Sequence, residues 1–156
     1  MSLLSLLGIN KIEQGKGGHT LCEDIFHVVG VSYCIDHVMK LATCNPEWEK
    51  NGRSILAQGG AGKKIYRYCF INKPVKILPE PNNSHDRDAL LVQIAGEKIG
   101  YISRQDNINV KRILGKNSVK FTSAFISGGQ YKVVSKNGET IKTDCDISIT
   151  VKIGYT

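Results

Sequence analysis

The amino-acid sequence predicts a mainly β protein, built as a small and partly open β-barrel rather than as a parallel sheet. Short runs rich in β-branched and aromatic residues follow one another at close spacing, which is typical of antiparallel barrels. Turn signals such as Asn137-Gly138 separate these runs. One or two helical patterns are set among the strands, which also favours a barrel.

The first strand is predicted at residues 26–33, FHVVGVSY, because β-branched residues dominate this run. Residues 34–44 then carry apolar side chains at helical spacing, and Asn45-Pro46 ends this helix. Residues 46–64 are polar and glycine-rich, so we expect a loop there.

Most of the remaining chain reads as strands. The next four strands are predicted at residues 65–71, 75–80, 89–96 and 97–103. Gly96 begins a tight hairpin between the last two of them. Two or three further strands are expected between residues 120 and 155, with the hairpin turn KNGE at residues 136–139.

A second helix is predicted between these groups of strands, over residues 104–117. Ile108, Ile113 and Leu114 can share its apolar face. Gly115 lies close to its expected end.

The chain of 156 residues fits one domain, predicted over residues 21–156, with residues 1–20 as a flexible leader. Hydrophobic residues make up 41% and charged residues 22%, which excludes a wholly disordered chain. No apolar run reaches the ~18 residues that cross a bilayer, so no membrane partner is expected. The N-terminus has neither a basic leader nor a cleavage pattern, and we expect a cytoplasmic or nucleoid-associated protein.

The net charge of +7 is concentrated in one part of the chain. Residues 63–120 hold 12 Lys and Arg against 5 Asp and Glu, whereas the rest of the chain holds 9 of each. Such focusing raises the local concentration of polyanions. A basic surface also keeps an ordinary protein soluble, so the charge alone leaves both interpretations open.

The cysteines do not form a convincing metal site. The five of them include no Cys-x-x-Cys pair, so free thiols in a reducing compartment are expected. His19 with Cys22 and Cys34 with His37 are two pairs with ligand-like spacing. The predicted strand between the pairs would hold them roughly 25 Å apart, too far for one zinc ion.

A metal-dependent nuclease is an alternative that Asp86, Asp88, Glu97 and Lys98 suggest. Asp86 and Asp88 would share one face of an extended segment. Two carboxylates alone do not make a metal site, and no third carboxylate with its lysine follows at the usual spacing. We therefore expect no metal, no cofactor and no catalytic residue.

The polar segment EPNNSHD, residues 80–86, carries more hydrogen-bonding capacity than a connecting turn needs. Its Asn82, Asn83, His85 and Asp86 side chains can cap the backbone of their own turn. They can also bind a ligand at the edge of the barrel. Taken alone, the segment favours capping.

Three tyrosines on or beside predicted strands, Tyr33, Tyr101 and Tyr131, add a second signal. A strand tyrosine is usually part of the core or of a barrel edge. On a basic barrel face, an exposed ring stacks on unpaired bases and contributes about 1–3 kcal/mol per base, whatever the base sequence.

Two segments resemble the HIRAN domain, a module of certain helicase-like, Swi/Snf-type DNA repair ATPases and of bacterial and phage proteins. They are HVVGVSY at residues 27–33 and the run EPNNxxDxxALxV followed by GYI within residues 75–104. The resemblance covers residues 26–35 and 65–135. It implies a small OB-like β-barrel with about two α-helices, which binds the 3′ end of single-stranded DNA.

The resemblance also implies how the strand end is bound. Tyr33 would stack on the terminal base, and Asn83 and His85 would line the pocket. Asp86 would accept a hydrogen bond from the terminal 3′-hydroxyl. A carboxylate in a basic groove attracts a hydroxyl and repels a 3′-phosphate, so Asp86 would select a free end.

The rest of the implied interface contacts the strand behind its end. Tyr101 and Arg104 would contact the backbone phosphates, and Tyr131 would stack on the next base. Ser32 departs from the family, since a basic residue at this place can bind phosphate. Residues 34–64 are longer than the expected connection and are interpreted as an insertion.

The leading hypothesis is a non-catalytic module that captures 3′-hydroxyl ends of single-stranded DNA in DNA processing, replication or repair. We expect no ATPase motor in this module, so any remodelling would come from a partner, for which a helicase or a nuclease is the candidate. The rival hypothesis is a protein-interaction module that binds through the insertion at 34–64 and its lone Trp48.

Overall fold

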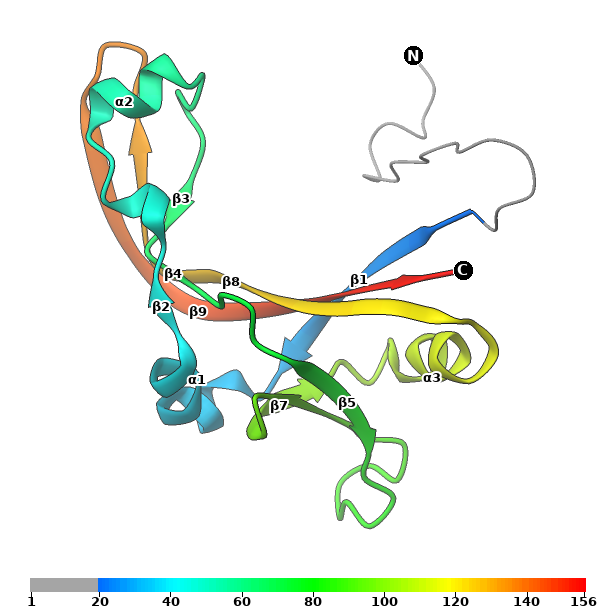
Figure 1. The fold of residues 1–156 in the computed structure, drawn as a ribbon. Coiled ribbons are helices and arrows are strands. Elements are labelled where there is room, and N and C mark those ends of the chain that lie inside the picture. The colour runs from blue at the N-terminus through cyan, green and yellow to red at the C-terminus, as the bar shows by residue number, and fades with distance from the viewer. Residues whose placement is uncertain (1–19) are drawn as a thin grey trace.

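The computed structural model describes residues 20–156, and Figure 1 shows their fold. The leader predicted for residues 1–20 lies, apart from Thr20, outside the described residues. The strands are β1 (Cys22–Val29), β2 (Thr43–Cys44), β3 (Ile65–Tyr66), β4 (Tyr68–Cys69), β5 (Val75–Pro79), β6 (Leu90–Ile94), β7 (Glu97–Ile102), β8 (Val119–Val134) and β9 (Thr140–Tyr155). The helices are the 3₁₀ turns η2 (Val31–Cys34) and η3 (Pro46–Trp48) and the α-helices α1 (Ile35–Leu41), α2 (Gly52–Ala57) and α3 (Asn107–Lys116).

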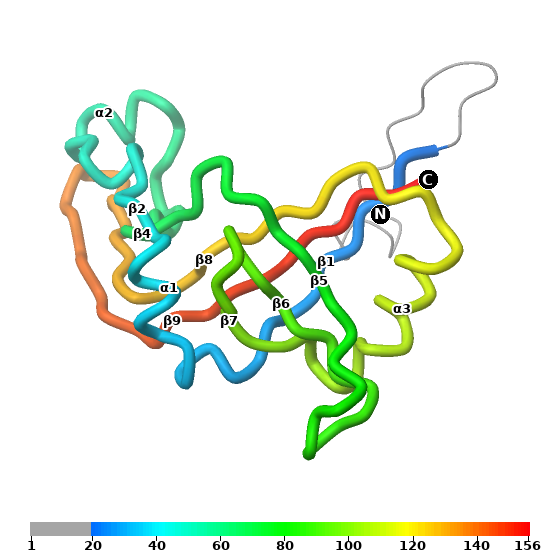
Figure 2. Tube along the Cα trace, turned by 60° about the horizontal axis from the view of Figure 1, so that its bottom comes forward, coloured from blue at the N-terminus to red at the C-terminus, as the bar shows by residue number. Residues whose placement is uncertain are grey.

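The predicted fold class is confirmed, because the protein is mainly β and antiparallel. One sheet runs in the order β3-β8-β9-β1-β7-β6-β5, and β2 pairs with β4 beside it. Figure 2 shows β5, β6 and β7 crossing the long ribbon of β8 and β9. The sheet therefore curls over itself and stays open between its two edge strands, β3 and β5.

A hydrophobic core fills the space between the two halves of the sheet. The fully buried side chains from the two halves include Leu90, Val92 and Ile94 of β6 and Ile149, Val151 and Ile153 of β9. Their alternate spacing is that of strands with one buried face. Val38 of α1 and Val110 of α3 join the same core, so the two helices are packed on the sheet.

The first strand was predicted four residues too late. β1 ends at Val29, because Gly30 takes a left-handed conformation with φ of 75°. The chain then turns into η2, whose Val31 and Cys34 are buried. Tyr33 consequently lies on a 3₁₀ turn and not at the end of a strand.

The helix predicted after this strand is confirmed and ends at Leu41. The loop predicted for residues 46–64 is wrong in part, because η3 and α2 lie within it. Asparagine side chains cap both: Asn45 accepts a hydrogen bond from the Glu47 amide, and Asn51 accepts one from Ser54. Asparagine is a preferred N-cap residue, so Asn45 and Asn51 were signals in the sequence that helices begin at these two places.

The apolar face predicted for the second helix was partly wrong. In α3 the buried residues are Asn107, Val110 and Ile113, whereas Ile108 is 80% exposed. The core face thus includes a polar residue, and a nearby isoleucine points to solvent. No helix in residues 20–156 is long and apolar enough to cross a membrane.

The C-terminal region forms two long strands. β8 continues through Gly128 and Gly129, where the register with β9 shifts. Both glycines have positive φ, 131° and 77°, so they bend the strand without ending it. The turn predicted at residues 136–139 is confirmed as the connection between β8 and β9.

Gly100 brings β7 against β1 at the place where η2 begins. A Cβ on Gly100 would lie 2.4 Å from the Val29 carbonyl oxygen and 2.8 Å from Cγ1 of Val28. Its φ of 156° is also unusual for other residues. This close approach holds the start of η2 beside β7.

We predict that Gly100→Ala lowers the free energy of unfolding by roughly 1–3 kcal/mol, because the backbone has no room for a methyl group. The matched control is Gly115→Ala in the last turn of α3, where nothing lies within 4 Å of the added Cβ. That helical substitution should stabilise by about 0.5–1 kcal/mol. Denaturant unfolding measures both, and equal effects of the two substitutions would contradict the packing described here.

Candidate functional site

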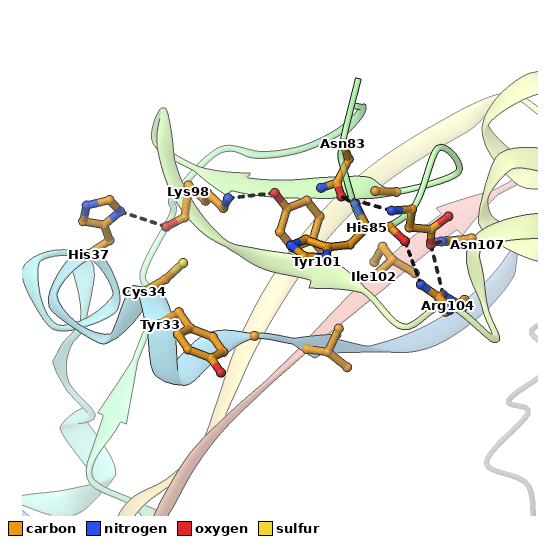
Figure 3. Close-up of a pocket in the computed structure, with 14 residues that line it drawn as sticks. Tyr33, Cys34, His37, Asn83, His85, Lys98, Tyr101, Ile102, Arg104 and Asn107 are labelled. Carbon is orange, nitrogen blue, oxygen red and sulfur yellow. Dashed lines mark hydrogen bonds and ion pairs between the residues drawn. The ribbon is translucent and has the colours of Figure 1, made fainter. Parts of the chain in front are cut away.

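A pocket of about 670 Å³ lies between η2, β7 and the loop that connects β5 to β6. Figure 3 shows the side chains around it. Six of the seven predicted site residues line this pocket: Tyr33, Asn83, His85, Asp86, Tyr101 and Arg104. Residues 50 or more positions apart in the sequence therefore meet in one place.

Tyr131 does not line this pocket. It lies on β8, where its ring centroid is 6.0 Å from that of Tyr66 in an edge-on arrangement. The ammonium of Lys64 lies 4.6 Å from the Tyr131 ring centroid. Tyr131 thus belongs to a separate aromatic and basic region of the molecule.

Tyr33 is 93% exposed, although Val31 and Cys34 of the same turn η2 are buried. Its amide donates to the Gly30 carbonyl at 3.2 Å, and the buried Val31 and Cys34 anchor the turn. Figure 3 shows the Tyr33 ring across the pocket from Tyr101. A rigid backbone thus presents a ring whose faces are open to a ligand.

Asn83 organises the loop between β5 and β6. Its Oδ1 accepts hydrogen bonds from the amides of His85 (2.9 Å) and Asp86 (3.1 Å). Its Nδ2 donates to Glu80 at 2.7 Å. The capping expected for this segment is therefore present, and it shapes the wall of the pocket.

Asp86 joins three parts of the structure. Its Oδ1 accepts from the amide of Asp88 at 2.9 Å. Its Oδ2 accepts from the side chain of Asn107 at 3.2 Å and lies 3.4 Å from Nε of Arg104. Arg104 also donates to the His85 carbonyl at 3.1 Å. The loop, the end of β7 and the start of α3 are tied together at this carboxylate.

Asn107 is the site residue that sequence reasoning missed. It is 2% exposed, and its Oδ1 is the one buried side-chain polar atom without a partner that residues 20–156 contain. Its position three residues before Val110 on the buried face of α3 was the available signal. Because Ile108 was predicted on the buried face of this helix, its neighbour Asn107 was not expected there.

A hydrogen-bonded chain runs along the wall of the pocket that faces Tyr33. Lys98 donates to the Tyr101 hydroxyl at 2.7 Å, and that hydroxyl donates to Glu80 at 2.7 Å. The hydrogen bonds from Tyr101 and Asn83 hold the pKa of the Glu80 carboxyl below its usual value. The contact with Tyr101 likewise raises the pKa of the Lys98 ammonium. Both groups are therefore charged at neutral pH and fix the Tyr101 ring.

The residues of the nuclease alternative do not converge on one point. Asp88 pairs with Lys111 at 2.6 Å, and Glu97 pairs with Lys40 of α1. No group of three His, Cys, Asp or Glu side chains within residues 20–156 is arranged to hold a metal ion. The three carboxylates of this alternative are instead paired with cations of the protein itself, Asp86 with Arg104, Asp88 with Lys111 and Glu97 with Lys40.

The site as a whole offers an exposed ring, a carboxylate with fixed geometry and two exposed cationic side chains, Lys98 and Arg104. The ring suits a flat apolar group, the carboxylate suits a hydroxyl or amine, and the cations suit phosphates. A strand end of a nucleic acid combines these groups.

Comparison with known proteins gives one match. The family model described as the HIRAN domain matches residues 25–152, nearly the whole chain. The matched range spans residues 34–64, and the interpretation of that segment as an insertion stays a prediction. No curated protein and no solved structure matches.

We predict a pH-dependent loss of stability for Glu80→Gln. Because the pKa of Glu80 is lowered on folding, its carboxylate stabilises the folded state above the ordinary value of 4.5. This contribution disappears as the pH falls through the lowered folded value. The variant should therefore have a lower thermal midpoint than the wild type at neutral pH, and the difference should vanish in acid.

The control for this measurement is Glu139→Gln, which removes the same charge from the exposed turn between β8 and β9. Its thermal midpoint should follow that of the wild type across the pH range. A Glu80→Gln deficit that persists unchanged in acid would contradict the assigned role of the carboxylate.

Proposed function

Because the chain belongs to the HIRAN domain family, we propose that it captures the 3′-hydroxyl end of single-stranded DNA in the pocket between Tyr33 and Asp86. Membership of this family makes the chain a nucleic-acid-binding module. The observation that carries the finer proposal is a 93% exposed tyrosine ring and a fixed carboxylate that line the same pocket.

The terminal base stacks on the ring of Tyr33. Because the neighbours of Tyr33 anchor η2, little conformational entropy is lost when a base docks. The pocket volume of about 670 Å³ lies in the usual range for small-ligand sites and accommodates one nucleotide. Tyr101 and His85 supply the opposite wall.

The terminal hydroxyl donates to Asp86. A carboxylate offers about four lone-pair sites, and three N–H groups already approach this one, from Asp88, Asn107 and Arg104. One site remains, and a 3′-hydroxyl can fill it. A 3′-phosphate places negative charge against the carboxylate and is excluded.

The phosphates behind the end interact with Arg104, whose side chain is 75% exposed, and with the ammonium of Lys98. These contacts release counterions, so the affinity falls as salt is added. The module acts by binding and carries out no chemistry itself. It works in DNA processing or repair, together with a helicase or a nuclease that uses the captured end.

We predict that Tyr33→Ala weakens binding of a short single strand by about 1–3 kcal/mol, the usual contribution of one stacked base. The ring is exposed, so the variant should fold normally. Tyr33→Phe retains the stacking surface and should bind like the wild type. Fluorescence anisotropy with a labelled oligonucleotide measures all three, and wild-type affinity in a folded Tyr33→Ala protein would exclude the stacking role.

We predict that Asp86→Asn abolishes the preference for a 3′-hydroxyl over a 3′-phosphate. Asparagine keeps the size of the side chain and removes its charge. Asp88→Asn is the matched control. It removes the same charge only two residues away, from a side chain that pairs with Lys111 and does not line the pocket. Anisotropy gives the ratio of the affinity for the 3′-hydroxyl strand to the affinity for the 3′-phosphate strand. This preference should be lost in Asp86→Asn and retained in Asp88→Asn. Equal ratios in both would remove Asp86 from the selection of the end.

A further inference from the structure

We propose that the molecule carries a second nucleic-acid contact, at which Arg67 and Lys142 bind phosphates of the strand beyond its captured end and the buried charge of Lys132 adds to the attraction. The contact lies on the arm formed by η3, α2, β3 and the adjoining ends of β8 and β9, at the upper left of Figure 1. It is centred on four residues, named here the Trp48 cluster: Trp48, Arg67, Lys132 and Lys142. The inference rests on the proposed nucleic-acid binding and extends it to a part of the fold outside the pocket.

Three cations surround one indole ring. The ammonium nitrogens of Lys132 and Lys142 lie 5.3 and 5.6 Å from the Trp48 ring centroid. The guanidinium carbon of Arg67 lies 6.0 Å from it. The face of an indole attracts cations, but a ring without net charge cannot neutralise three of them.

The two lysines repel each other in the free protein. Lys132 and Lys142 are direct partners across the antiparallel pair of β8 and β9, where like charges are destabilising. Lys132 cannot turn away, because it is 5% exposed and donates to the carbonyls of Trp48 (2.5 Å) and Lys50 (2.7 Å). Burial, together with the charge of Lys142, lowers the pKa of the Lys132 ammonium.

The nearby carboxylates compensate this charge only in part, because Glu49 raises the pKa of the Lys132 ammonium while burial and the charge of Lys142 lower it by more. None of the three cations forms a salt bridge within residues 20–156. Asp144 accepts a hydrogen bond from Gln130, and Glu49 accepts one from the Cys44 thiol. Arg67 has only a 3.3 Å contact to the amide oxygen of Gln130. An anion bound here would relieve the repulsion that the fold retains.

Charge complementarity favours a nucleic-acid strand as the occupant. Its phosphates supply closely spaced anions, and the rings of this region can stack on its bases. Arg67 also lies 5.5 Å from the Tyr68 ring, and Lys64 lies against Tyr131. Alternating cations and rings are the usual equipment of a single-strand groove.

The test compares Lys142→Gln with Lys116→Gln, which removes the same charge from the last turn of α3, across the molecule from the arm. Both lysines are exposed, so both variants should fold. Each protein is titrated with single strands of about 4 and about 16 nucleotides, all with a free 3′-hydroxyl, at several salt concentrations. Trp48 is the only tryptophan of the chain, so its fluorescence reports directly on the cluster.

We expect Lys142→Gln to weaken binding of the long strand and to reduce the slope of log affinity against log salt by about 1. Binding of the short strand should not change, and only the long strand should alter the Trp48 fluorescence. The same substitution should raise the thermal midpoint, since it removes the repulsion with Lys132. Lys116→Gln should show none of these effects.

The proposal is overturned if the long strand binds Lys142→Gln with wild-type affinity and leaves the Trp48 fluorescence unchanged, in which case an acidic protein surface is the better partner. It is also overturned if both variants lose the same affinity for the long strand. A short strand that fails to bind the wild type would contradict end capture in the pocket. If the long strand then still binds Lys142→Gln more weakly than the wild type, that result would continue to support the contact on the arm.

Discussion

The site depends on the carboxylate of Asp86, which connects elements that are distant in the sequence. It accepts hydrogen bonds from the loop backbone and from Asn107 at the start of α3, and it pairs with Arg104 after β7. Because a partly buried charge must be compensated, these contacts fix the loop in one conformation. Gly100 fixes the other side of the pocket by holding η2 against β7. Together they set the width of the pocket.

Most of the fold could be predicted from the sequence, because strand alternation and turn residues are local signals. The boundaries could not, since Gly30 ends β1 early and Gly128 bends β8 without ending it. Six of the seven proposed site residues were brought together through family resemblance, which carries long-range information that periodicity lacks. Asn107 was missed because a buried polar residue on a helix looks like an error in an apolar face.

The positive charge is divided between two regions of different character. In the pocket, Arg104 is paired with the Asp86 carboxylate and Lys98 donates to the Tyr101 hydroxyl, so their positions are fixed and the local field is moderate. On the arm, the cations of the Trp48 cluster lack such partners within the described residues and repel one another. Paired charges suit recognition of one chemical group, and unpaired charges suit attraction of a polyanion. The division fits a module that selects an end and also holds the strand behind it.

The central claim is that the pocket binds an end rather than the middle of a strand. The most direct measurement compares the affinity of the wild-type protein for a linear single strand with its affinity for the same sequence closed into a circle. Both ligands present the same bases and nearly the same charge, and only one has a 3′-hydroxyl. If the pocket binds an end, the linear strand is bound distinctly more tightly at every salt concentration. Equal affinity for the two would contradict this claim and would leave a groove that binds single strands without regard to their ends.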